Sequence, residues 1–222
     1  MSDVMTNGKV LDREATINEI TKLEWDMFSA VKNVGGPAGC QSQRKTFEIM
    51  RKAQHQMWGD DTLETYKMDL LTATLNGDNL MTYKYGYMMK STFPQEYEQI
   101  KDQLPEIGSA RRKLVTWLTE QHNEWTKEAA AKYPKLCAWG RPLDEQAANG
   151  STWASVENYF YCELLTYSTA TLQWCKRDFE ECLEVGENPV LGVLTYIAEC
   201  YGYTKLEDIE AALQKVTPDN LV

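Results

Sequence analysis

The stretch REATINEITKLEWDMFSAVK, residues 13–32, shows the pattern that decides the fold. Its apolar residues recur at intervals of three and four, so they line one side of an α-helix. Asp12 precedes it in the position of an N-cap, whose side chain accepts a hydrogen bond from the first turn. We therefore predict a helix over 13–32, ended by Gly35 and Gly36, because glycine accepts left-handed cap geometry. The apolar stripe consists of Ile17, Ile20, Met27, Phe28 and Val31.

The same helical spacing continues along the chain, and prolines and glycines separate the segments that carry it. We find no strand-like alternation, internal repeat or low-complexity tract. The sequence therefore predicts an all-α fold, a multi-helix bundle of about eight to nine helices in one domain. Ser42 and Asp60 are the expected N-caps of the second and third helices. After the first helix, the predicted helices cover residues 42–58, 60–76, 79–91, 94–104, 109–132, 155–185, 189–201 and 205–215.

A chain of 222 residues suits one sizeable domain. We expect a flexible N-terminus over residues 1–11, the helical domain over 12–216, and a C-terminal tail over 217–222. The longest irregular segment is predicted at 133–153, which holds two prolines and two glycines. Loops of this length in a compact domain are often lids or binding loops. We therefore expect Arg141, in this segment, to fold over the same region as Arg51.

Composition excludes several classes of protein. Hydrophobic residues make up 43% of the chain and charged residues 25%, as in soluble globular proteins. The net charge of −10 opposes binding to nucleic acids or anionic membranes, which attract basic surfaces. Neither a signal-peptide hydrophobic region nor an apolar run of about 18 residues is present. We expect an acidic cytoplasmic protein with no nucleic-acid or membrane partner; its oligomeric state stays open.

Six cysteines and two histidines offer no recognisable metal site. The cysteines form no CxxC pair and follow no zinc spacing, so we expect reduced thiols. His55 and His122 belong to no ExxH, HxxxH or HExxH motif, which disfavours a di-iron centre. The patterns of Ser/His/Asp hydrolases and Walker nucleotide-binding loops are also absent. We therefore predict no metal, and the cofactor, if the protein uses one, stays unknown.

Ionisable residues fall on the apolar sides of three predicted helices. Glu24 lies within the stripe of the first, Arg51 and Gln54 within that of the second, and Glu163 within that of the late helix. An unpaired buried charge costs several kcal/mol, so these groups should meet one another, a ligand or water. One interpretation is a structural network in which Arg51 bridges Glu24 and Glu163. The other is a polar pocket lined by aromatic residues.

The loop Gly35–Gln41 also has two interpretations. Its three glycines are consistent with a simple turn between helices. Alternatively, the free backbone N–H groups of the next helix, with Arg44 and Lys45 in its first turn, attract an anion. The same field would favour the thiolate of Cys40, although cysteine is also a common small core residue. We predict that the loop is the edge of a site and that Cys40 faces a cavity near Arg51.

Four motifs in order give a family resemblance: EWDMFSAVKNVGG, CQSQRKTFEIMRKAQ, YPKLCAWGRP and SVENYFYCELLTYS. Together they resemble a bacterial family catalogued as domain of unknown function 4125, found mostly in anaerobes. The resemblance covers about residues 12–203 and implies no established activity; an anaerobic setting fits reduced thiols. The family's loop usually has arginine where this chain has Pro37, which weakens an anion site there if that arginine binds ligand. The family's motif residues match here at Glu24, Trp25, Cys40, Gln41, Arg51, Gln54, Gly140, Arg141, Glu163 and Tyr167.

Our leading functional hypothesis is an all-α protein with a polar pocket for an anionic or zwitterionic metabolite, with enzymatic acid/base or cysteine chemistry as an extension. The alternative is a helical interaction or regulatory module whose acidic surface meets a basic partner and whose polar core is purely structural. A concave pocket that gathers the candidate residues would favour the first. The candidate catalytic residues are Glu24, Cys40 and Glu163. The candidate substrate-binding residues are Gln41, Arg51, Gln54, Arg141 and Tyr167.

Overall fold

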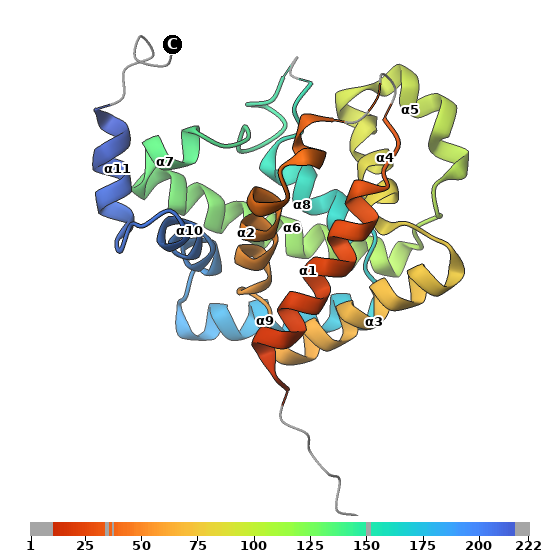
Figure 1. The fold of residues 1–222 in the computed structure, drawn as a ribbon, viewed down its shortest axis with the longest axis horizontal. Coiled ribbons are helices and arrows are strands. Elements are labelled where there is room, and N and C mark those ends of the chain that lie inside the picture. Colours follow the sequence, from red (N-terminus) through yellow and green to blue (C-terminus); the bar gives the residue numbers. More distant parts are fainter. Residues whose placement is uncertain (1–10, 34–35, 37, 150–151, 216–222) are drawn as a thin grey trace, which may run out of the picture.

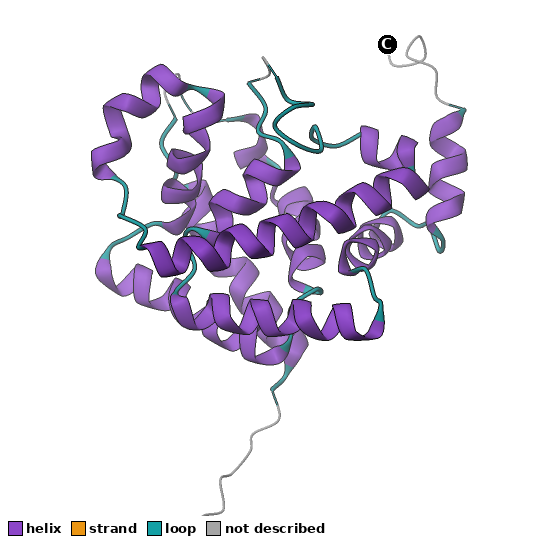
Figure 2. Ribbon diagram, turned by 180° about the vertical axis from the view of Figure 1, so that it is seen from behind, coloured by secondary structure: helices purple, strands orange, loops and turns teal. Residues whose placement is uncertain are grey.

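The computed structural model describes residues 11–33, 36, 38–149 and 152–215. Within these ranges the chain folds into eleven α-helices and two 3-10 helices, with no strand (Figures 1 and 2). The all-α prediction is confirmed, but eight to nine helices were too few. The expected C-terminal tail and, except for Leu11, the expected flexible N-terminus lie outside the described residues. No helix in the described part is long and apolar enough to cross a membrane.

Most helices lie within a few residues of their predicted bounds. In chain order the α-helices are α1 (Arg13–Ser29), α2 (Arg44–His55), α3 (Asp60–Asn76), α4 (Leu80–Thr92), α5 (Pro94–Ile100), α6 (Ser109–Lys132), α7 (Pro134–Ala138), α8 (Val156–Leu164), α9 (Thr169–Val185), α10 (Pro189–Cys200) and α11 (Leu206–Gln214). The 3-10 helices are η1 (Gly39–Ser42) and η2 (Lys101–Gln103). The bounds of α3 and α6 are those predicted.

The single helix predicted over residues 155–185 is wrong. The structure divides it into α8 and α9, because Ser168 becomes the N-cap of a new helix. The Ser168 hydroxyl accepts from the backbone N–H of Thr171 at 3.2 Å, and Asp69 on α3 accepts from the Ser168 N–H at 2.9 Å. The chain therefore turns where Asp69 binds the Ser168 N–H, a backbone donor that a continuous helix would have used.

The segment predicted to be irregular also contains a helix, α7. The Glu210 carboxylate on α11 accepts from the backbone N–H groups of Lys135 at 2.9 Å and Leu136 at 2.8 Å. These are free donors in the first turn of α7, and a negative charge at a helix N-terminus is stabilising. Because Glu210 lies far along the chain, no local pattern indicates this cap.

Asp12 is the N-cap of α1, as predicted, and accepts from the Ala15 N–H at 3.1 Å. The other predicted boundaries need correction. Helix α1 ends at Ser29, before the glycines, and Gly35 lies outside the described residues. Gly36 has a left-handed φ of 99°, but it lies in the loop. The predicted N-caps Ser42 and Asp60 are wrong as well: Gln43 precedes α2 and Gly59 precedes α3.

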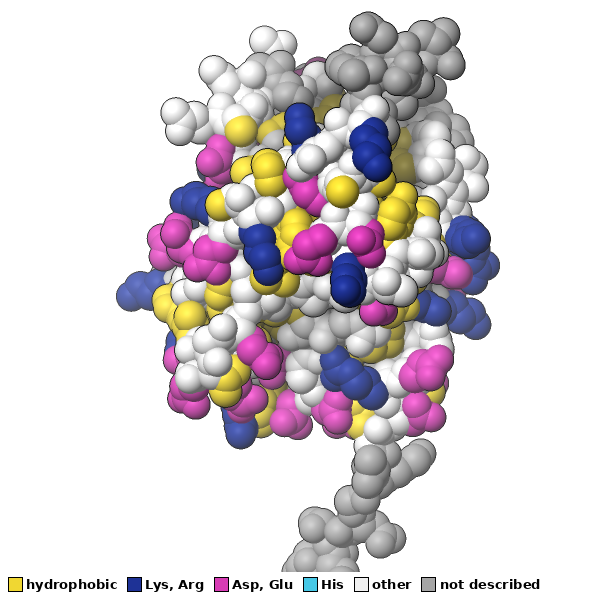
Figure 3. Space-filling view, turned by 90° about the vertical axis from the view of Figure 1, so that its left-hand side faces the viewer, with side chains coloured by type: hydrophobic (Ala, Val, Ile, Leu, Met, Phe, Trp, Pro, Cys, Tyr) yellow, Lys and Arg dark blue, Asp and Glu magenta, His cyan; other side chains and the backbone are white. Residues whose placement is uncertain are grey.

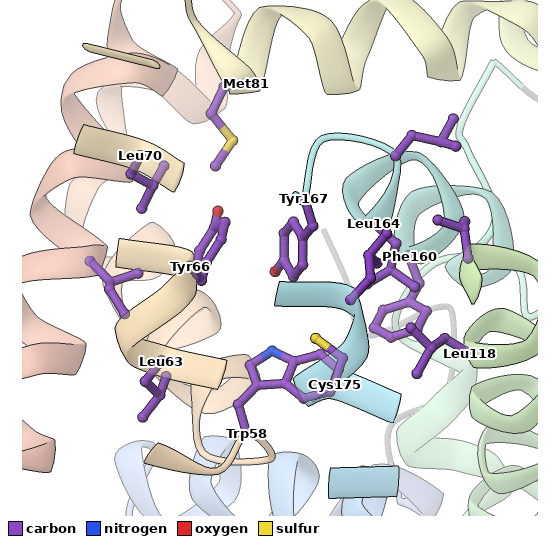
Figure 4. Packing of buried hydrophobic residues seen from close by; sticks show 14 of the residues in the cluster. Trp58, Leu63, Tyr66, Leu70, Met81, Leu118, Phe160, Leu164, Tyr167 and Cys175 are labelled. Atoms are coloured by element: carbon purple, nitrogen blue, oxygen red, sulfur yellow. The ribbon is translucent and has the colours of Figure 1, made fainter. Parts of the chain in front are cut away.

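Helix α1 packs against α2, α3 and α4, while α9 packs against α3 and α6. Figure 2 shows α6 running across the back of the molecule. Helices α7, α10 and α11 gather at one end, and on that face acidic, basic and apolar side chains are interspersed (Figures 1 and 3). The core between α3, α8 and α9 is rich in aromatic rings, and Tyr66 and Tyr167 face each other there, with centroids 4.4 Å apart (Figure 4). This core surrounds the polar residues described below.

A buried histidine in the core makes stability depend on pH. His122 on α6 stacks on Phe160 with ring centroids 4.0 Å apart, and burial lowers the pKa of its imidazole to about 4. In the unfolded chain the imidazole binds a proton near pH 6.5, so stability is present above that pH and is lost as pH falls toward 4. We expect a loss on the order of 2 kcal/mol between pH 6.5 and 4.5.

Urea unfolding at several pH values checks this expectation. The His122→Phe variant keeps an aromatic ring beside Phe160 but cannot titrate. Its free energy of unfolding should therefore change less than that of the wild type between pH 6.5 and 4.5. Equal pH dependence in both proteins would contradict the assignment to His122.

Candidate functional site

Arg51 on α2 lies between two carboxylates, as the sequence predicted. Its Nε donates to Glu24 at 2.9 Å, its Nη1 donates to Glu163 at 2.8 Å, and its Nη2 donates to both. The remaining Nη1 hydrogen goes to the side-chain oxygen of Gln54 at 2.6 Å. All five guanidinium hydrogens are therefore used. We call the group around Arg51 the buried network: Glu24, Arg51, Gln54, His55, Tyr66, Lys84, Glu163 and Tyr167.

The Glu24 carboxylate on α1 is fully enclosed. Besides Arg51, it accepts from the Tyr66 hydroxyl at 2.8 Å and from His55 Nε2 at 3.0 Å. The other ring nitrogen of His55, Nδ1, has no hydrogen-bond partner among the described residues. Burial alone would raise the pKa of Glu24, but Arg51 and His55 outweigh it and lower the pKa to about 2.

Glu163 on α8 is held still more tightly. In addition to Arg51, it accepts from Gln54 Nε2 at 2.6 Å, from the Tyr167 hydroxyl at 3.0 Å and from the ammonium group of Lys84. Burial opposes ionisation, but the two cations, Arg51 and Lys84, hold the pKa of Glu163 well below its usual range. Both carboxylates of the network are therefore ionised at neutral pH.

The buried network balances its own charge: two carboxylates face one guanidinium and one ammonium group. Glu24 is 0% exposed, and Lys84 and Glu163 are each 1% exposed. Every carboxylate oxygen accepts at least two hydrogen bonds. Saturated, weakly basic carboxylates are poor general bases near neutral pH. The geometry therefore favours a structural role for Glu24 and Glu163, tying α1, α2, α4 and α8 together.

The network meets the protein surface at Tyr159 on α8, which is partly exposed. The Lys84 Nζ lies 3.4 Å from the centroid of the Tyr159 ring, and the Arg141 guanidinium carbon lies 4.7 Å from it. Burial would raise the pKa of Tyr159, but Lys84 and Arg51 outweigh burial and lower the pKa from its ordinary value. Two cations thus contact one phenol at the outer end of the network.

Arg141 lies near the same end, as expected for the loop that carries it. Burial raises the pKa of Tyr85, and Tyr159 and Cys40 raise it further, whereas Arg141 and Arg51 lower it. Tyr85 and Tyr159 pack against the same small cluster of Met88, Ala154 and Cys162. Arg141 contacts the same Tyr159 ring as Lys84, and Lys84 shares Glu163 with Arg51, so the loop reaches the outer end of the buried network.

The guanidinium of Arg141 is half-buried and donates from Nη1 to the backbone oxygen of Ala154 at 3.1 Å. It forms no ion pair with a carboxylate among the described residues. Its remaining N–H donors have no hydrogen-bond partner among the described residues. This distinguishes Arg141 from Arg51, whose donors are all used.

The other candidates differ in what they can contact. Cys40 is exposed in η1. Gln41 donates to the backbone oxygens of Phe28 at 3.0 Å and Val31 at 2.9 Å, and its own oxygen accepts from Asn33 and from the Ala38 N–H. Gln41 therefore anchors the end of α1 and has no hydrogen-bonding capacity left for a ligand. Tyr167 is 0% exposed and serves to orient Glu163. Gln54 is partly exposed.

Sequence analysis missed Lys84, Tyr159 and the role of His55. The signal for Lys84 was present, since it lies between Met81 and Met88 on the apolar side of α4. Tyr159 precedes Glu163 by one helical turn and so shares its face. The arrangement is not one of metal ligands: no group of three or more His, Cys, Asp or Glu residues in the described part could hold a metal ion.

A family model described as "Protein of unknown function (DUF4125)" matches residues 14–211. The chain belongs to this family. No curated protein and no solved structure matches it. The DUF4125 match spans α1 to α11 and so includes every residue of the buried network, as well as Arg141 and Tyr159. The family description assigns no activity, and the functional argument therefore rests on the geometry of these residues.

Proposed function

We propose that this protein binds a small carboxylate-bearing molecule where the buried network reaches the surface. We call this site the Arg141 edge: Cys40, Gln54, Tyr85, Arg141 and Tyr159. The observation that carries the proposal is the half-buried guanidinium of Arg141, which has free donors and no carboxylate partner among the described residues. Arginine matches carboxylates with two parallel hydrogen bonds, so an acidic ligand is the natural complement.

Charge balance favours an anion over a zwitterion at this edge. The two carboxylates of the buried network are fully occupied by Arg51 and Lys84, and their charges cancel. The charge of Arg141 is therefore an excess, and no free carboxylate of the network is left to receive a ligand amine. The phenol of Tyr159, whose pKa is lowered, is the group best placed to exchange a proton with a bound molecule.

The buried network contributes by holding this edge rigid. Arg51 and Lys84 fix α2 and α4 against α8, which carries Tyr159. Preorganised groups bind with a smaller loss of conformational freedom. The alternative, an interaction module with a structural polar core, shares the same network and differs in needing no ligand at Arg141. A cytoplasmic location remains part of the proposal, and six unpaired cysteines fit a reducing compartment.

A melting-temperature screen with succinate, citrate and benzoate tests the proposal. We expect at least one of these probes to raise the melting temperature of the wild type. Calorimetric titration of that probe should then show a loss in affinity of about 10- to 100-fold in Arg141→Met, the range expected for a charged hydrogen-bonded pair.

The matched control is Arg177→Met, because Arg177 also stacks on an aromatic ring, that of Trp174 at 5.2 Å, but pairs with Glu181. This variant should bind the probe like the wild type. Equal affinity in Arg141→Met and the wild type, or no stabilisation by any of the three carboxylates, would refute an anion site at the Arg141 edge.

A further inference from the structure

A cavity lies across α8 from the Arg141 edge. It has a volume of about 650 Å³ and is bounded by α4, α5, η2, the segment that leads into α6, and α8. Tyr161, Cys162 and Leu165 line it, whereas on the same stretch of chain Tyr159 belongs to the Arg141 edge and Glu163 to the buried network. None of the network residues lines this cavity. Its volume is in the range typical of small-molecule sites.

The cavity has an apolar floor and aromatic walls. Ile107, Cys162 and Leu165 are buried beneath it. Burial raises the pKa of the Cys162 thiol to about 12, so this thiol stays neutral and acts as part of the apolar floor. The rings of Tyr97 and Tyr161 contribute to the walls, and neither hydroxyl has a hydrogen-bond partner among the described residues. Such a surface suits an apolar body with polar ends.

Exposed charged residues of both signs, without ion-pair partners among the described residues, lie at the rim of this floor. Lys90 and Arg112 line the cavity and form no ion pair with any described carboxylate, and Asp102 and Glu106 likewise have no cationic partner. The fifth charged residue of the lining, Lys101, is paired with Glu98 at 2.6 Å. Cations and carboxylates that do not satisfy one another are complementary to a ligand that carries both charges.

We propose that this cavity binds a zwitterion with an apolar body, namely an apolar amino acid or a short apolar peptide. The ligand carboxylate lies at Lys90 and Arg112, the ligand ammonium group lies at Asp102 and Glu106, and the side chain covers the floor. The proposal is independent of the Arg141 edge, whose single excess charge selects an anion.

Calorimetric titrations with L-leucine and L-leucyl-L-leucine test this proposal. We expect saturable binding of at least one of them, and which one binds distinguishes a free amino acid from a peptide. N-acetylleucine lacks the ammonium group, leucinamide lacks the carboxylate and glycine lacks the apolar body. Each should bind about fivefold more weakly or worse, the loss expected for one partly exposed charge pair or a missing apolar contact.

Substitutions at the cavity test whether the ligand binds there. Lys90→Ala/Arg112→Ala should remove the preference for leucine over leucinamide. Lys127→Ala/Lys135→Ala, which removes two exposed cations elsewhere, and Arg141→Met should both keep that preference. The proposal is overturned if neither leucine nor leucyl-leucine shows saturable binding, or if the Lys90/Arg112 variant discriminates between leucine and leucinamide as well as the wild type does.

Discussion

Arg51→Met is expected to unfold the protein or to lower its free energy of unfolding by about 3–5 kcal/mol, the usual effect of removing one partner from a buried ion network. Methionine fills a similar volume but leaves Glu24 with only His55 and Tyr66 as partners, while Glu163 loses two hydrogen bonds. Both carboxylates remain buried, so water cannot replace the lost donors. Chemical denaturation monitored by circular dichroism measures the effect.

Two comparisons separate this effect from a general loss of charge. Arg44→Met removes an exposed arginine of the same helix, paired with Glu48, and should change stability by less than about 1 kcal/mol. Replacing the whole charged set, Glu24→Leu/Arg51→Met/Lys84→Met/Glu163→Leu, should recover much of the stability lost in Arg51→Met, because no buried charge is then left unpaired. A loss below about 1 kcal/mol in Arg51→Met would contradict the network.

The free energy of unfolding should decrease at acidic pH because the same two carboxylates become protonated. Burial raises the pKa of Glu24, but Arg51 and His55 outweigh burial and lower it from 4.5 to about 2. The pKa of Glu163 is lowered in the same way, with Arg51 and Lys84 outweighing burial. The unfolded chain therefore takes up protons first, so the stabilisation is present above pH 4.5 and is lost as pH falls toward 2. The loss from Glu24 alone is about 3 kcal/mol.

The Glu24→Gln variant tests whether protonation of Glu24 causes this loss of stability. The amide cannot titrate, so this variant, although less stable at neutral pH, should show a shallower fall in the free energy of unfolding between pH 4.5 and 2. Denaturant titrations across this range give both slopes. If the slopes of the wild type and the variant coincide, Glu24 does not titrate as the geometry requires.

Local sequence was sufficient for much of the fold. Helices α3 and α6 have the predicted bounds because each is a long segment with helical apolar spacing, and Gly77 ends α3 while Pro134 follows α6. The division between α8 and α9 depends on Asp69, and α7 depends on Glu210. Both caps come from residues far along the chain, which hydrophobic spacing does not relate to their targets.

The site was also predictable in part. A charge on an apolar stripe needs a buried partner, and this sufficed to place Arg51 between Glu24 and Glu163. Which partners saturate which oxygens depends on the meeting of α1, α2, α3, α4 and α8, so the sequence could not show that these carboxylates are fully occupied. Nor could it show that Gln41 anchors α1, or that Arg141 has donors without a partner among the described residues.

The most direct test of the carboxylate site is a crystal structure of the protein soaked with 4-bromobenzoate, whose bromine is located by anomalous scattering. We predict the probe at the Arg141 edge, with its carboxylate within hydrogen-bonding distance of the Arg141 guanidinium and its ring near Tyr159. The contacts among Glu24, Arg51 and Glu163 should be unchanged. Bromine bound only at other places, or an Arg141 that pairs with a protein carboxylate and leaves the probe uncontacted, would contradict the account.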